Sequence, residues 1–121
     1  MHFVDNNVTI SNVRWSVQRS VQRGLDERTF TWDEYKQETN IKKHGITFIE
    51  AATVFDDVNA LISGDPDHSQ DEDRFVIIGF SESARLLIVC HCYRTNDSII
   101  RIISARKANR KERKEYGGRT K

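Results

Sequence analysis

The pattern of apolar and polar residues predicts two consecutive helices in residues 31–55. Thr31 and Thr47 are each followed three residues later by glutamate, which is the spacing of a helix-capping box. Residues 47–55 also carry apolar side chains at helical intervals. Gly45 lies between the two boxes, where a left-handed backbone would end the first helix near His44. We therefore expect a helix–turn–helix pair.

Strand-like segments follow these helices. Apolar runs separated by turn residues occupy residues 60–63, 75–80, 86–93 and 99–105. Short turns between successive strands predict an antiparallel meander. Residues 109–116 predict a short last helix, which we expect Gly117 and Gly118 to end.

These elements together predict the α+β class. Two N-terminal helices would pack on one face of a curved, four-stranded antiparallel sheet, with a short C-terminal helix after it. The 121 residues suffice for one core. We assign residues 29–121 to this domain. Residues 1–28 mix helical and strand-like spacing, so this N-terminal extension is either a short docked element or a mobile leader.

Charge is distributed unevenly along the chain, although the formal net charge is only +1. Residues 56–73 contain seven acidic residues and no lysine or arginine. Residues 101–121 contain nine basic residues against two glutamates. A basic segment of this density favours a polyanion or an acidic protein as the partner.

Several classes of protein are disfavoured by the sequence. There is no apolar run of the roughly 18 residues that a membrane-spanning helix needs, and the N-terminus does not resemble a signal peptide. Cys90 and Cys92 would lie about 7 Å apart on one face of a strand, an awkward span for a disulfide. We expect reduced thiols and a cytoplasmic protein.

The basic residues at the end of the last predicted strand are the first candidates for chemistry. Regular alternation would place Arg101 and Lys107 on one face of the strand and Arg106 on the other. Guanidinium groups bind phosphate through paired hydrogen bonds and stabilise charge that develops during phosphoryl transfer. The alternative is structural pairing with acidic residues; the candidates are Asp56, Asp57 and Glu72.

His91 is the second candidate, because an imidazole can move protons near neutral pH. A histidine satisfied within the core is the alternative. Cys90, His91 and Cys92 resemble a metal-binding cluster, but alternation points the imidazole away from the thiols, and a second pair of ligands is missing. We expect no metal and no cofactor.

The span from Trp32 to Tyr116 resembles the BrnT family of bacterial type II toxins. The matching strings are W-D-E at 32–34, N-I-K-K-H-G-I-T-F at 40–48, E-A-A-T-V-F-D-D at 50–57, D-P-D-H-S at 65–69, R-F-V-I-I-G at 74–79 and R-I-I-S-A-R-K-A at 101–108, followed by Glu112 and Tyr116. Residues 1 to about 28 lie outside this resemblance.

The resemblance implies a compact fold related to the RelE and ParE toxins. It also implies a ribonuclease that cleaves RNA, halts translation and arrests growth. A BrnA-type antitoxin with a ribbon-helix-helix module would neutralise the toxin, and their complex would bind operator DNA.

Position by position, the resemblance and the basic pattern together give our candidate site. We expect Arg74, Arg101 and Arg106 to act in catalysis, with His91 as acid or base. Lys43, Lys107 and Arg110 are the expected substrate-binding residues. All the arginines of the catalytic set should converge on one phosphate pocket. The alternative function is a non-enzymatic, ParE-like toxin or a binding module that acts on gyrase, DNA or an acidic protein.

Overall fold

The computed structural model of the chain describes residues 16–17, 28–65, 74–95 and 98–120. Its helices are α1 (Glu34–His44), α2 (Phe48–Thr53), the short 3-10 helix η4 (Val54–Asp56) and α3 (Arg110–Thr120). Its strands are β1 (Ser16–Val17), β2 (Thr29–Thr31), β3 (Leu61–Gly64), β4 (Phe75–Phe80), β5 (Leu86–Arg94) and β6 (Ile99–Lys107). The α+β class is confirmed.

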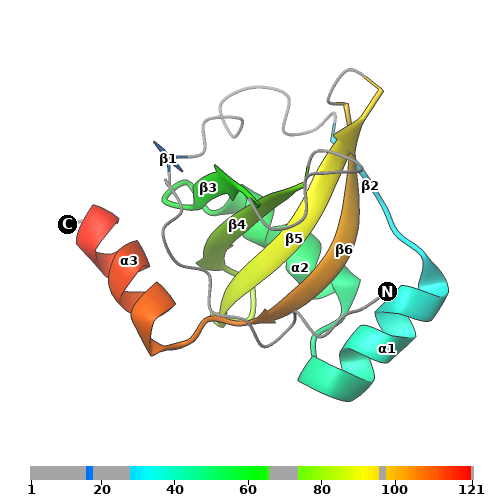
Figure 1. Cartoon of the computed structure of the whole chain (residues 1–121), viewed down its shortest axis with the longest axis horizontal. Helices are drawn as coiled ribbons and strands as arrows, with labels where there is room; N and C mark the ends of the chain where they lie inside the picture. The colour runs from blue at the N-terminus through cyan, green and yellow to red at the C-terminus, as the bar shows by residue number, and fades with distance from the viewer. Residues whose placement is uncertain (1–15, 18–27, 66–73, 96–97, 121) are drawn as a thin grey trace.

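The described strands form one six-stranded sheet in the order β1-β3-β4-β5-β6-β2 (Figure 1). Its centre, β3 to β6, is the predicted antiparallel meander. The expected four-stranded antiparallel sheet is nevertheless wrong at both edges. β1 adds an antiparallel strand beside β3, and β2 pairs with β6 in parallel. The outer edges of β3 and β6 offer backbone donors and acceptors. Residues from the N-terminal quarter of the chain, in β1 and β2, pair with these edges.

The N-cap of the first helix lies two residues later than the expected Thr31. This N-cap is Asp33, whose carboxylate accepts hydrogen bonds from the backbone N–H groups of Tyr35 and Lys36 at 2.8 and 3.3 Å. Thr31 cannot cap the helix because it belongs to β2. The C-cap is as predicted, since Gly45 has a left-handed φ of 71°.

The last helix has a capping box that the sequence analysis did not identify. Asn109 Oδ1 accepts from the Glu112 backbone N–H at 2.8 Å, and Glu112 Oε1 accepts from the Asn109 N–H at 2.9 Å. The expected end at Gly117 is wrong, because α3 continues to Thr120.

A β-bulge in β6 changes the expected faces of its basic residues. Cys90 pairs with Ser104 and the next residue of β5, His91, pairs with Ile102, so Ile103 has no partner. Arg101 pairs with Cys92 and Arg106 with Ile88. Those two β5 residues lie on one face, which places both arginines on that face. Lys107 pairs with Leu87 and lies on the other face, contrary to regular alternation.

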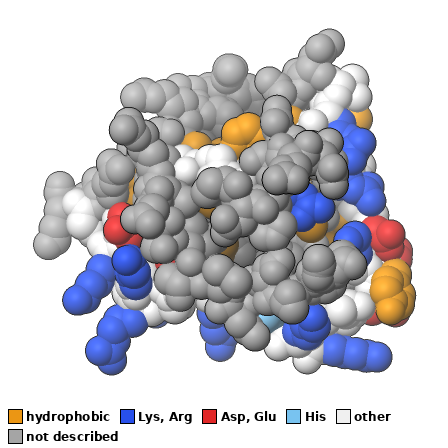
Figure 2. All heavy atoms as spheres, in the orientation of Figure 1, with side chains coloured by type: hydrophobic (Ala, Val, Ile, Leu, Met, Phe, Trp, Pro, Cys, Tyr) orange, Lys and Arg blue, Asp and Glu red, His pale blue; other side chains and the backbone are white. Residues whose placement is uncertain are grey.

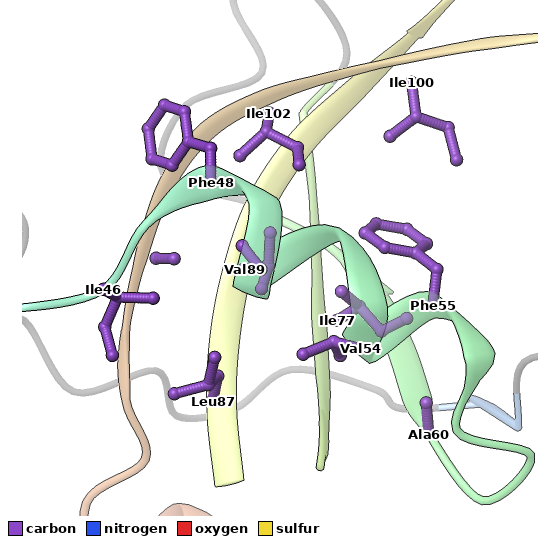
Figure 3. Close-up of a cluster of buried hydrophobic side chains, with 12 residues drawn as sticks. Ile46, Phe48, Val54, Phe55, Ala60, Ile77, Leu87, Val89, Ile100 and Ile102 are labelled. Carbon is purple, nitrogen blue, oxygen red and sulfur yellow. The ribbon is translucent and has the colours of Figure 1, made fainter. Parts of the chain in front are cut away.

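Each face of the sheet has its own core. Helix α2 lies against the face that carries Leu87, Val89 and Ile102; in Figure 3 Phe48 of α2 lies near Ile102, and Phe55 of η4 lies near Ile100. On the opposite face, Tyr116 of α3 packs with residues of β3, β4 and β5: Leu61, Val76, Ile78, Leu86 and Ile88. Helix α2 thus covers the first face, and α3 covers part of the second face.

Asn40 connects α1 to β6 through a buried amide. Its Nδ2 donates to the carbonyl oxygens of Ile46 at 3.0 Å and Ala105 at 2.9 Å, and its Oδ1 accepts from the Ala105 N–H at 3.0 Å. The residue is only 4% exposed. Ala105 pairs with Val89 of β5 on one side, and on the other side, beyond the pairing with β2, the Asn40 side chain takes the place of a strand. It thereby fixes the end of α1 beside the end of β6.

Replacing Asn40 with alanine should destabilise the protein strongly. The substitution leaves the Ala105 N–H and two carbonyl oxygens without their partner, and an unsatisfied buried polar group costs about 1–3 kcal/mol. We expect urea unfolding to show a loss of about 3 kcal/mol in the free energy of unfolding. Glu38→Ala, on an exposed position of the same helix, is the control. Equal stability of the two variants would contradict the role given to Asn40.

Candidate nucleic-acid interface

Four of the seven expected site residues lie at one end of the sheet. Lys43 belongs to the last turn of α1, Arg106 and Lys107 to the end of β6, and Arg110 to the start of α3. We call Lys43, Arg106, Lys107 and Arg110 the basic edge. In Figure 1 the ends of α1 and β6 and the start of α3 occupy the lower margin.

Contacts among the loops hold this end together. The Arg85 guanidinium, before β5, donates through Nη2 to the Gly45 carbonyl oxygen at 3.3 Å and also pairs with Glu50. The Ala108 N–H donates to the Leu86 carbonyl oxygen at 2.9 Å. The turn after α1, the turn before β5 and the segment after β6 are thus joined by hydrogen bonds.

Positive charge is exposed along the basic edge. Lys43, Lys107 and Arg110 have exposed side chains, and Figure 2 shows lysine and arginine side chains along the lower margin of the molecule. Cations spaced along one edge can each contact a different phosphate of a bound strand. Geometry and charge therefore suit a nucleic-acid backbone.

Arg106 has a structural partner that the sequence did not indicate. Its Nη1 and Nη2 each donate to one carboxylate oxygen of Glu112 at 2.9 Å. The Glu112 side chain is 0% exposed and that of Arg106 is 15% exposed. The expected acidic partners were Asp56, Asp57 and Glu72, whereas the chain uses the N-terminal turn of α3. Arg106 thus fixes α3 against the sheet.

Arg74 and Arg101 lie toward the other end of the sheet. The β5 partners of Arg101 and Arg106, Cys92 and Ile88, are four residues apart, which corresponds to about 13 Å at ~3.3 Å per residue. Arg74 directly precedes β4, next to the pairing of Phe75 with His91. The sequence analysis expected the arginines to converge on one phosphate pocket. This spacing contradicts that expectation. The roles of Arg74 and Arg101 stay predictions.

His91 is a core residue, which argues against the expected acid–base role. It is 0% exposed, its Nδ1 lies 3.2 Å from the Val89 carbonyl oxygen, and its Nε2 lies 3.2 Å from the Tyr93 hydroxyl. Its ring packs edge-on against Phe55. Burial lowers the pKa of His91 to about 4, so the imidazole is neutral at pH 7. Because the ring is fully buried, it also cannot reach a bound strand.

His44 is the residue at the basic edge that the sequence analysis did not select. Its pKa is lowered, first by burial and then by the charges of Arg106 and Lys43. Its Nε2 is buried and has no hydrogen-bond partner within the described part of the chain. The signal available in the sequence was its place in the K-K-H-G string at the end of α1.

The described residues include no group of three or more His, Cys, Asp or Glu side chains that could hold a metal ion. Cys90 and Cys92 are free thiols. Burial, and then the nearby charge of Asp65, raise the pKa of Cys90 to about 12. This thiol is consequently protonated and a poor nucleophile at neutral pH. Within the described segments no helix is long and apolar enough to cross a membrane.

A family comparison identifies the protein class. The sequence model of a family described as "Ribonuclease toxin, BrnT, of type II toxin-antitoxin system" matches residues 32–112. The chain belongs to the BrnT family. The match contains the whole basic edge and ends at Glu112, the partner of Arg106. Among curated proteins, none shows a significant sequence match.

A solved structure supports the family at the level of the fold. The crystal structure of the Brucella abortus ribonuclease toxin BrnT is similar to this chain with a TM-score of 0.51 and 25% sequence identity. The similarity covers 69% of this chain and 99% of the Brucella chain. The rest of the present chain lies outside this similarity.

Replacing Glu112 with alanine should loosen α3. Removing one partner of a buried ion pair leaves the other charge uncompensated, which costs about 3–5 kcal/mol. Arg106 is partly exposed, so we expect about 3 kcal/mol, measured by urea unfolding. The matched control is Glu115→Ala, at an exposed position of the same helix.

A double-mutant cycle isolates the pair itself. Arg106→Ala combined with Glu112→Ala should be less destabilising than the sum of the two single variants, because the double variant leaves no uncompensated charge. Strict additivity would show that Glu112 supports α3 through its cap alone.

Proposed function

We propose that this BrnT-family protein cleaves RNA without a metal ion and binds the strand along its basic edge. The observation that supports the proposal is the clustering of exposed cations from α1, β6 and α3 beside the buried Arg106–Glu112 pair. Membership of a family of ribonuclease toxins supplies the reaction class. The family also disfavours the alternative of a non-enzymatic toxin acting on gyrase.

Metal-free cleavage of RNA has three chemical requirements. The ribose 2′-hydroxyl must be held in line with the phosphorus, negative charge on the phosphoryl oxygens must be balanced, and protons must move at the attacking and leaving oxygens. Lys43, Lys107 and Arg110 meet the first two requirements by binding successive phosphates. Arg106 contributes mainly through position, since Glu112 already occupies both of its terminal nitrogens.

The other two arginines of the expected catalytic set fit a longer binding path. Arg101 shares a sheet face with Arg106. Arg74 precedes Phe75, which pairs with His91, so it lies beside the end of β5 that pairs with Arg101. A single strand that extends beyond the basic edge would meet Arg101 next. We propose that these two residues contact flanking nucleotides rather than the scissile phosphate.

In the cell, cleavage of this kind would halt translation in the cytoplasm. A type II toxin is controlled by a protein antitoxin, and we propose a BrnA-type partner with a ribbon-helix-helix module, whose complex with the toxin binds operator DNA. An acidic segment of that partner would cover the basic edge, because burying these cations both blocks RNA and satisfies their charge.

The purified protein should cleave single-stranded RNA in the presence of EDTA. Because the 2′-hydroxyl is the nucleophile, one product should end in a 2′,3′-cyclic phosphate, which mass spectrometry identifies. The same oligonucleotide with a 2′-deoxy sugar at the cleaved position is the control and should stay intact. Intact RNA, or cleavage only after addition of Mg²⁺, would contradict the proposal.

The salt dependence of binding tests which cations contact RNA. Each phosphate contact with a single strand contributes about 0.7 to the slope of log affinity against log salt concentration. Lys107→Ala and Arg110→Ala should each lower the slope by about 0.7, measured with the 2′-deoxy oligonucleotide. Lys36→Ala, at the far end of α1, should leave the slope unchanged. A larger change for Arg101→Ala than for Lys107→Ala would place the strand on the other end of the sheet.

A further inference from the structure

We propose that His44 is the general base of the cleavage reaction, activated by its position between Lys43 and Arg106. The inference rests on the proposed function, because it assigns a proton-moving group to RNA cleavage at the basic edge. His91 cannot supply that group, since it is fully buried with both ring nitrogens in contact with protein atoms.

The first argument is the unsatisfied ring nitrogen. His44 Nε2 is buried and lacks a hydrogen-bond partner among the residues that the structure describes. Buried polar atoms almost always have a partner, so an exception at a charged surface points to a ligand that completes it. A ribose 2′-hydroxyl is a hydrogen-bond donor and would supply the missing bond once a rotation of the side chain brings Nε2 to the edge.

The second argument is the charge around the imidazole. Lys43 approaches it from its own helix and Arg106 from β6, and Glu112 of α3 is already paired with that arginine. Burial and these two cations lower the pKa of His44 below its usual value of 6.5. The free protein therefore holds His44 neutral at pH 7, which is the state in which an imidazole accepts a proton.

Substrate binding would reverse part of this effect. A phosphodiester carries one negative charge, and when it binds beside Lys43 and Arg106 it offsets their repulsion of an imidazolium. The pKa of His44 then rises in the complex, and its basicity increases where it is used.

His44 is the last residue of α1. Its side chain as a whole is only partly buried, although Nε2 itself is buried. A rotation of the His44 side chain would carry Nε2 from its buried position to the edge, next to Lys43.

The proposed step balances as follows. His44 Nε2 takes the proton of the 2′-hydroxyl, the 2′-oxygen forms a bond to phosphorus, and the bond from phosphorus to the 5′-oxygen breaks. The 5′-oxygen leaves with a proton from water. The products are a 2′,3′-cyclic phosphate and a 5′-hydroxyl, and the imidazolium then returns its proton to solvent.

The test compares His44→Gln with the wild-type protein on a short RNA oligonucleotide. A positioned general base contributes about 100-fold or more to the rate, so we expect kcat to fall by at least that factor while RNA affinity changes little. Glu38→Gln, an exposed substitution on the same helix, is the control. Urea unfolding should show equal stability of all three proteins, which a purely structural His44 would not give.

The pH dependence gives an independent readout. In the wild type, kcat/KM should rise with pH through a pKa below 6.5, which reports the free protein, and kcat should rise through a higher pKa, which reports the complex. For the His44→Gln variant, this rise with pH should be absent from both the kcat/KM and the kcat profile. If the profile of His44→Gln still rises through the wild-type pKa, the assignment is overturned.

A modified substrate separates a base from an acid. Replacing the scissile 5′-oxygen with sulfur creates a leaving group that needs no proton. If the cleavage rate of His44→Gln recovers on this substrate, His44 acts as the acid and the inference is overturned. If the rate of the variant stays low, the role of His44 as the base is supported. If wild-type protein cleaves neither substrate, the proposed function fails. If wild type and His44→Gln cleave equally, only the role of His44 fails.

Discussion

The buried amide of Asn40 is the interaction on which the arrangement of the site depends. It satisfies both backbone groups of Ala105 and the carbonyl oxygen of Ile46. Those bonds hold the last turn of α1 at a fixed position along β6. Lys43 and His44 follow Asn40 on the helix, and Arg106 follows Ala105 on the strand. One side chain thus determines that groups more than sixty residues apart in sequence share one edge.

The opposite face of the sheet reaches the same edge by a different device. Glu112 is fully buried, caps α3 through the Asn109 N–H and binds both terminal nitrogens of Arg106. Farther along the helix, the Tyr116 hydroxyl donates to Asp57 Oδ2 at 2.7 Å, and the same oxygen accepts from the Phe80 N–H at 2.8 Å. Burial, with the adjacent Asp57 carboxylate, raises the pKa of Tyr116, so the hydroxyl remains a donor. Helix α3 consequently presents its exposed lysines and arginines from a fixed position.

This construction separates the charged pairs that support the edge from the exposed cations that we propose contact RNA. The charged groups that hold the edge in place, Glu112 with Arg106 and Glu50 with Arg85, are paired, and each pair is partly or wholly removed from water. The cations at the surface remain exposed, and the charges of Lys43 from one set and Arg106 from the other both act on His44. A binding surface for a polyanion gains specificity in this way, because its exposed charge is positioned by pairs that do not themselves need the ligand.

The sequence by itself determined the local elements and the class of the protein. Helix caps at Thr47 and Gly45, the meander from residue 61 to residue 107 and the family strings all depend on residues close together in the chain. Only the tertiary structure decided the rest. The parallel strand β2 moved the first cap to Asp33, the bulge at Ile103 placed Arg106 on the face of Arg101, and folding enclosed His91 while bringing His44 next to Arg106. Pairing across strands and burial depend on contacts distant in sequence, and spacing along the chain does not encode them.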